Sequence, residues 1–172
     1  MSERRRLPVL SNTPPPEAGD DEGEERPPLH WVGFGTVAIF AAWLPLAYVA
    51  GAVSSRVMTS RFGGDASQEA IALGVAAMDP GGRARLMATV ALPGLAALAI
   101  AAFGGGFVVG RFGDRTGTRE AALSGVACAI VTSILAWSGV TLTAVAGVIV
   151  TALVAVGFAA WGGRFGLRRR PH

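Results

Sequence analysis

Three long stretches of the chain contain no charged residue. Asp, Glu, Lys and Arg are absent from residues 27–55, 86–110 and 121–163. A helix needs about 20 apolar residues to cross the hydrocarbon core of a bilayer, at a rise of about 1.5 Å per residue. The first two stretches each have room for one such helix, and the third has room for two. The pattern therefore predicts four membrane-spanning helices, at about 31–55, 86–110, 119–137 and 141–161.

The first 28 residues are polar and differ in kind from the rest of the chain. They contain three consecutive prolines, Pro14 to Pro16, and a cluster of acids between Asp20 and Glu25. Few apolar residues follow Leu10, so this segment cannot bury enough surface to offset the entropy lost on ordering. We expect a disordered cytoplasmic tail over 1–28, with a docking segment for a partner as the alternative.

Residues 56–85, between the first two predicted spans, form the one long loop in the pattern. Either Asp65 or Ser67 is suited to cap the start of a short helix, because a short polar side chain accepts a hydrogen bond from the first turn. Apolar residues then recur at spacings of four and three, which places them on one helix face. We expect a short amphipathic helix at about 66–78 that lies on the membrane surface or caps the bundle.

Sequence signals also mark where the second helix begins and where the chain leaves the membrane. Asp79 followed by Pro80 is typical of an N-cap and a first helical position, so this helix can begin before the apolar run does. At the other end, arginines dominate residues 167–172, which we expect to form a basic cytoplasmic tail. The four-helix transmembrane domain accordingly covers residues 29–166.

Composition favours a membrane location. Hydrophobic residues make up 51% of the chain and charged residues 16%, and the mean hydropathy is +0.47. A chain this apolar does not solvate its own surface as a water-soluble domain. We therefore expect an all-α fold, that is, a polytopic membrane protein with four transmembrane helices in a compact bundle, and the lipid bilayer as its first partner.

The basic residues are all arginine, which together with the many alanines and glycines indicates a bacterial genome rich in G and C. The sequence pI is about 10.4, yet the arginines lie next to apolar runs, where they anchor spans among the headgroups. No nucleic-acid partner is therefore expected.

Arginine counts also predict the orientation of the chain in the membrane. Eleven arginines lie in residues 1–28, 111–119 and 162–172, against four in the 56–85 loop. Because cytoplasmic segments carry the excess of basic residues, both termini are predicted to be cytoplasmic. The expected location is the bacterial cell inner membrane, with the 56–85 loop in the periplasm.

Small residues recur at every fourth position on the second, third and fourth predicted spans. Such a stripe puts a smooth groove on one helix face, and in lipid these faces are where helix backbones approach closely. The alternative is that alanine and glycine are simply abundant in this composition. We interpret the stripes as packing faces. The residues predicted to pack helices together are Gly106, Gly125, Ala129, Gly147 and Thr151.

The charged turn between the second and third spans reads GRFGDRTGTR, and it resembles the cytoplasmic loop between the second and third helices of major facilitator transporters. The resemblance implies an aspartate that braces neighbouring helix ends and arginines that pair with it, as part of a gate. It is confined to this turn, and four spans are fewer than one six-helix half of such a transporter. The matching residues form the candidate functional turn: Gly110, Asp114, Arg115, Gly117 and Arg119.

A purely topological interpretation of the same turn is also open, and we favour it. Glycine allows the chain to reverse, arginine favours the cytoplasmic side, and aspartate caps the helix that follows.

A second resemblance covers spans two to four. The segment from Gly105 to Arg111 reads GGFVVGR, which is similar to a GGxxxGR signature in small bacterial four-helix membrane proteins of unknown function. This resemblance implies a four-helix fold and no activity.

The inventory of reactive side chains does not favour catalysis. The interior of the predicted spans lacks the acids and bases that mark pumps and intramembrane enzymes. Cys128 has no activating neighbour in the sequence, and His30 and His172 lie at opposite ends of the chain, so no metal cluster is expected. We expect no enzymatic activity, no catalytic residue, no cofactor and no metal.

Two functional hypotheses from different classes remain. The first is a structural or accessory subunit that packs with a larger membrane complex or with itself. The second is a small oligomeric channel or transporter module. The lack of charge within the predicted spans favours the first, because transported ions and protons need polar groups along their path.

Overall fold

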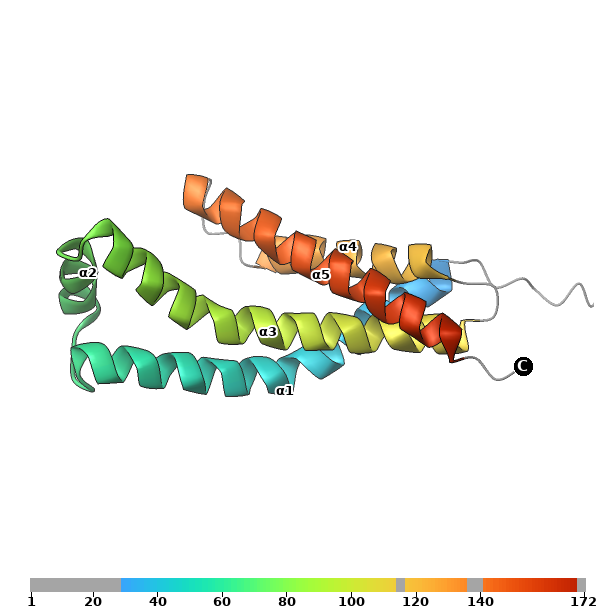
Figure 1. Cartoon of the computed structure of the whole chain (residues 1–172), viewed down its shortest axis with the longest axis horizontal. Helices are drawn as coiled ribbons and strands as arrows, with labels where there is room; N and C mark the ends of the chain where they lie inside the picture. The colour runs from blue at the N-terminus through green and yellow to red at the C-terminus, as the bar shows by residue number, and fades with distance from the viewer. Residues whose placement is uncertain (1–28, 114–116, 136–140, 170–172) are drawn as a thin grey trace, which may run out of the picture.

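The computed structural model describes residues 29–113, 117–135 and 141–169, and the regular structure within them is helical (Figure 1). Four of the described helices are long and apolar enough to cross a membrane. The prediction of an all-helical membrane protein with four spans is confirmed. The described helices are α1 (Leu29–Phe62), α2 (Gln68–Ala76), α3 (Pro80–Phe112), α4 (Thr118–Leu135) and α5 (Leu142–Arg168).

The helices form two hairpins that pack against each other. α1 and α3 run in opposite directions with α2 at their shared tip, and α4 and α5 form the second hairpin (Figure 1). α3 contacts α1, α4 and α5, so it is the central helix of the bundle. α1 begins and α5 ends at the end of the molecule opposite α2 (Figure 1).

α1 is longer than the charge pattern indicates. The pattern predicts a span that ends near Ser55, but the helix continues to Phe62. Gly63 then ends it with a φ of 87°, a left-handed conformation that glycine adopts without steric cost. Its amide donates a hydrogen bond to the carbonyl oxygen of Thr59 at 2.9 Å. Hydrophobicity therefore falls at Arg56, whereas the helix ends only where a glycine changes the backbone.

α2 closes the α1–α3 hairpin and is held at both of its ends. Ser67, one of the two predicted caps, accepts a hydrogen bond from the amide of Ala70 at 3.1 Å. At the other end, the Arg83 guanidinium donates to the carbonyl oxygens of Val75 and Ala76, at 3.3 and 2.9 Å. A cation at this position also suits the negative end of the helix dipole. α2 therefore caps the hairpin, one of the two placements that the sequence predicts.

Asp79 and Pro80 start α3 as the sequence indicates. The Asp79 carboxylate accepts a hydrogen bond from the amide of Gly82 at 3.0 Å, and Pro80 stands in the first turn. Proline has no amide hydrogen to leave unpaired there. α3 therefore begins ahead of its apolar run.

α1 and α3 are longer than a bilayer core is thick. Their 34 and 33 residues correspond to lengths of about 51 and 50 Å, against about 30 Å for the hydrocarbon core. The excess lies at the α2 end, where α1 carries Arg56 and Arg61 and α3 carries Arg83 and Arg85. We infer that these two helix ends project from the hydrocarbon core with α2 at their tip.

Both long helices contain a proline, and both bend along their length (Figure 1). Pro45 in α1 and Pro93 in α3 each remove one amide donor from the helical hydrogen-bond ladder. Near Pro93, the Ser54 hydroxyl of α1 donates a hydrogen bond to the carbonyl oxygen of Val90 in α3 at 2.8 Å. This bond joins the two helices close to the point where the α3 ladder is interrupted.

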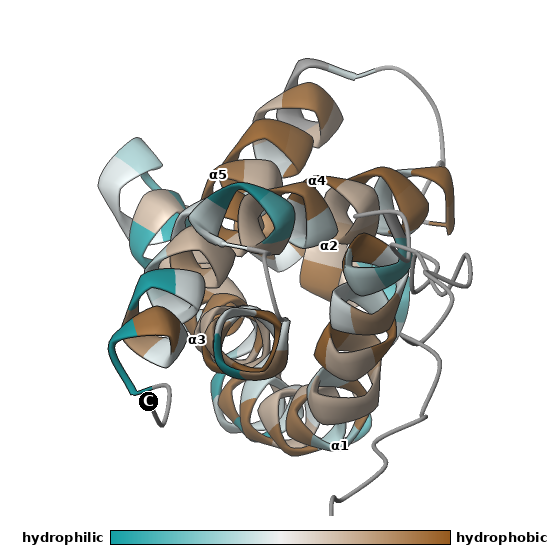
Figure 2. Cartoon of the chain, turned by 90° about the vertical axis from the view of Figure 1, so that its right-hand side faces the viewer, coloured by the Kyte–Doolittle hydropathy of each residue, from teal (hydrophilic) through white to brown (hydrophobic). Residues whose placement is uncertain are grey.

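Buried residues in the described part of the chain are mostly small, and many large apolar residues are exposed, the reverse of a water-soluble core. Most of the buried hydrophobic residues are alanines, whereas Leu153 is 69% exposed and Leu135 is 79% exposed. Figure 2 shows hydrophobic residues on every spanning helix. Water would drive such a surface to aggregate, whereas lipid solvates it and leaves small residues to bring the helices together.

Candidate functional site

α3 and α5 meet along a seam of glycines. A methyl group added at Gly106 would overlap the carbonyl group of Ala159, and one added at Gly110 would overlap the carbonyl group of Gly163. Only a hydrogen side chain permits this approach of the two backbones. The close approach increases the dispersion contacts that hold helices together in lipid.

The α5 half of this seam extends beyond the span that the sequence predicts. Gly162 and Gly166 both face the backbone of α3 so closely that neither has room for a methyl group. α5 continues to Arg168, past the end of the predicted span. The signal for this extension is present in the sequence, because the small-residue repeat continues from Ala159 to Gly163.

α4 carries two of the predicted packing residues on the side that faces the bundle. A methyl group at Gly125 would lie 2.7 Å from the carbonyl oxygen of Ala155 and 2.9 Å from the Cα of Val156 in α5. Ala129, about one turn further along α4, is buried. Gly125 therefore lies where the backbones of α4 and α5 are in close contact.

Ser124 is the buried polar residue of the described bundle, and it joins α4 to α1. Its hydroxyl lies within donating distance of two carbonyl oxygens, that of Val32 at 3.1 Å and that of Glu120 at 3.0 Å. The Thr36 hydroxyl donates to the same Val32 oxygen at 2.8 Å. Gly35 makes room for this contact, because a methyl group there would overlap the Ser124 side chain. Sequence reasoning did not select Ser124 as a packing residue.

Gly147 does not pack against another described helix of this chain, so the prediction for it is wrong. It is exposed, and an added methyl group would meet no atom within 4 Å. Each step of four residues turns about 40° past a full helical turn, so Gly147 points about 120° away from Ala159. Thr151 lies between them and is half-buried. Figure 1 also shows the start of α5 diverging from α3.

The candidate functional turn lies partly outside the described residues. Asp114 and Arg115 fall outside them, so their pairing stays a prediction. Gly110 is buried in the α3–α5 seam. Gly117 is half-buried just before α4, and Arg119 is exposed in the first turn of that helix. The structure thus brings Gly110 against α5 and leaves Arg119 at the surface.

The start of α4 is capped by Glu120, which sequence reasoning did not select for this role. Its Oε2 atom accepts a hydrogen bond from the amide of Gly117 at 2.7 Å. This contact is one half of a capping box, in which a glutamate in the first turn binds the amide at the helix start. The available sequence signal is a glutamate three residues after the capping position.

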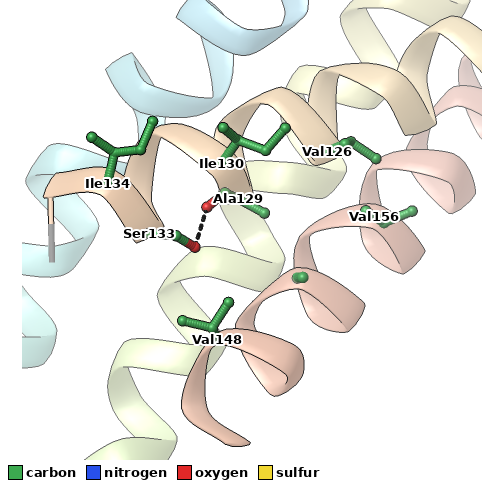
Figure 3. Close-up of a pocket in the computed structure, with 8 residues that line it drawn as sticks. Val126, Ala129, Ile130, Ser133, Ile134, Val148 and Val156 are labelled. Carbon is green, nitrogen blue, oxygen red and sulfur yellow. Dashed lines mark hydrogen bonds between the residues drawn. The ribbon is translucent and has the colours of Figure 1, made fainter. Parts of the chain in front are cut away.

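An open apolar groove of about 290 Å³ lies between α4 and α5 (Figure 3). Its one hydroxyl belongs to Ser133 and donates to the carbonyl oxygen of Ala129 at 2.7 Å. The groove therefore presents hydrocarbon and offers a polar ligand little to bind. The apolar residues that line the groove are Val126, Ala129, Ile130 and Ile134 on α4, and Val148, Ala152 and Val156 on α5.

Reactive side chains are sparse in the part of the chain that the structure describes. Cys128 is a free thiol buried within the bundle. Within the described ranges, no group of three His, Cys, Asp or Glu residues lies close enough to hold a metal ion. The features of the described residues that can bind a partner or ligand are therefore the helix contacts, the apolar groove and the arginines at the ends of α3 and α5.

Together these features define a multi-pass α-helical membrane protein. In the described part of the chain, its helices pack through close backbone contacts. Comparison with models of known protein families, with curated proteins and with solved structures found no match in any of the three.

Proposed function

We propose that this protein is a non-catalytic integral membrane subunit, structural or accessory, that packs with a larger membrane complex or with copies of itself. The groove between α4 and α5 supports this role. A neighbouring helix fills such a groove by inserting a row of side chains, as ridges enter grooves wherever helices pack. Ala129 and Ala152 are among its lining residues, and their short side chains allow a partner helix to come close.

The hydroxyl groups of the spans favour this role over a small channel. Thr36, Ser54 and Ser133 each donate to a backbone carbonyl oxygen, so their protons are used within the protein. A path for water or ions needs polar groups that face the path. The alternative of a channel or transporter module therefore finds little support in these side chains.

For the orientation, we propose that both termini are cytoplasmic and that α2 lies on the periplasmic side of a bacterial inner membrane. The excess of arginine in the end segments and the 111–119 turn supports this arrangement. The start of α1 and the end of α5 lie at one end of the bundle (Figure 1), as four spans require.

Native gel electrophoresis of gently solubilised membranes tests the subunit role. We expect the chain in a band larger than its monomer, together with a second membrane protein or with further copies. Ala152→Phe fills the groove and should shift the chain to the monomer position. Leu153→Phe, at the neighbouring exposed position, is the matched control and should leave the band unchanged. A monomer band for the wild type would contradict the proposal.

Ion flux into liposomes that contain the purified protein separates the subunit role from the channel. We expect flux no greater than in protein-free liposomes. Flux that requires the protein would favour the channel, whichever band the native gel gives.

A further inference from the structure

α3 and α5 end together at one end of the bundle (Figure 1), and arginine and phenylalanine side chains lie next to each other at these helix ends. The Arg111 guanidinium carbon lies 6.0 Å from the ring centroid of Phe107 and 5.7 Å from that of Phe112. The Arg169 guanidinium carbon lies 4.8 Å from the ring centroid of Phe165. The Phe107 and Phe165 rings are neighbours, with centroids 6.3 Å apart. Two arginines from two helix ends are therefore held around one aromatic pair.

The backbone keeps this arrangement compact. Gly166 of α5 lies so close to α3 that an added methyl group would overlap the carbonyl oxygen of Phe107 and lie 2.8 Å from the amide nitrogen of Arg111. The seam of glycines thus brings the two aromatic rings, and with them the two guanidinium groups, to the same corner of the bundle.

The ends of α3 and α5 carry positive charge, and the nearby carboxylate of Glu120 on α4 accepts a hydrogen bond from the amide of Gly117. α3 and α5 contain no Asp or Glu, and α5 adds Arg164 and Arg168. A guanidinium that lies over an aromatic ring keeps its N–H groups in its own plane, where they can still donate. Phosphate and carboxylate are the groups that arginine binds through two parallel hydrogen bonds. The corner is therefore suited to an anion with paired oxygens.

Aromatic side chains continue from this corner along the spans. Phe103 lies next to both Phe165 and Trp161, with ring centroids 6.1 and 5.5 Å apart. Trp161 also lies next to Phe158, at 5.8 Å, and is 59% exposed. A hydrocarbon chain that leaves the arginines can therefore follow an exposed aromatic surface.

We propose that the ends of α3 and α5 bind an anionic phospholipid, with Arg111 and Arg169 on its phosphate and an acyl chain along Phe103 and Trp161. Arginines at the ends of spans lie at headgroup depth, and the aromatic surface leads from there into the hydrocarbon. The acidic segment 20–25 of this chain is opposite in charge to the arginines, but it contains no apolar residue that would pack on the aromatic surface. The lipid accounts for both features, and it does so independently of any protein partner.

Native mass spectrometry of the full chain in a non-ionic detergent tests this site, with phosphatidylglycerol and phosphatidylcholine of identical acyl chains as probes. We expect phosphatidylglycerol to bind more tightly by about fivefold or more. Arg111→Gln combined with Arg169→Gln should weaken phosphatidylglycerol binding about tenfold. Equal affinity of the wild type for the two lipids would overturn the proposal.

The matched control removes the same charge from the other end of the molecule. Arg56→Gln with Arg61→Gln, both exposed on α1, should leave phosphatidylglycerol binding within about twofold. An equal loss in this control would mean that net charge alone attracts the lipid, and the site would be refuted. Arg169→Gln alone alters only an exposed side chain at the helix end and should still cost about threefold, so the test does not depend on folding of the double variant.

Two further binding measurements test whether another anion, and not the lipid, occupies the arginines. Deletion of residues 1–28, or Asp114→Asn, removes carboxylates of this chain and should leave phosphatidylglycerol affinity within about twofold. A gain of about tenfold would identify carboxylates as the occupants of the arginines and overturn the proposal. Millimolar inorganic phosphate should not displace phosphatidylglycerol, and displacement would show that the acyl chain contributes nothing.

Discussion

Gly106→Ala is the sharpest test of whether the α3–α5 seam holds the bundle together. The substitution adds one methyl group and, in the middle of a helix, introduces no unfavourable backbone preference. Any loss of stability must therefore come from the contact between the two helices.

The expected loss follows from how close the two backbones lie. The added carbon would be within 3.0 Å of three backbone atoms of Ala159, and no flexible side chain can move away to relieve the overlap. A separation of α3 and α5 by about 1 Å forfeits between a quarter and a half of each dispersion contact. At about 0.15 kcal/mol per contact and on the order of 30 contacts, the loss is about 2 kcal/mol. This value lies within the range of about 1–3 kcal/mol for overpacked cores.

The free energy of unfolding, measured by circular dichroism in mixed micelles of detergent and increasing SDS, reports the effect. Gly147→Ala is the matched control, because it adds the same methyl group to α5 at a place where no atom lies within 4 Å. We expect the control to be no less stable than the wild type, because alanine favours a helix over glycine by up to about 1 kcal/mol. If both variants unfold at the same SDS fraction, close backbone contact is not what stabilises this bundle.

Three further changes test other parts of the structure. Ser54→Ala removes the hydrogen bond to the Val90 carbonyl and should cost about 0.6 kcal/mol in the same unfolding assay; an unchanged value would mean that this bond gives no net stability. Glu120→Ala removes the cap on the Gly117 amide and should cost about 1 kcal/mol, most of which Glu120→Gln should restore; equal values for the two variants would refute the capping role. A compartment reporter inserted at 63–67 should report the periplasm and one at the C-terminus the cytoplasm. Reporters on the same side would contradict the three spans between them.

The number of spans can be predicted from the sequence because a charge in hydrocarbon is costly, so charge-free stretches mark the membrane directly. The caps Ser67 and Asp79 can be predicted because each accepts its hydrogen bond from an amide three residues away. Both features depend on residues that are close together in the sequence, so a sequence pattern is enough to predict them.

Helix ends and helix contacts are less accessible to such a pattern. α1 extends to Phe62 because loss of hydrophobicity does not end a helix. Gly106 and Gly147 belong to equally plausible small-residue stripes, yet only Gly106 faces another described helix closely. That difference depends on how each helix is rotated and where α5 diverges from α3, which no spacing of residues contains. Asp114 lies outside the described residues, so both interpretations of it stay untested: the brace that the resemblance implies and the simple helix cap that we favour.

The α2 cap determines which part of this protein is accessible from the water on its side of the membrane. α1 and α3 exceed the hydrocarbon thickness by roughly 20 Å, which is more than one headgroup layer of about 5–8 Å. We infer that α2, at the tip of the two projecting helix ends, stands clear of the lipid surface. An antibody, a protease or a labelling reagent that cannot cross the membrane can reach α2 while the spans remain embedded, which makes it the natural place for an epitope tag.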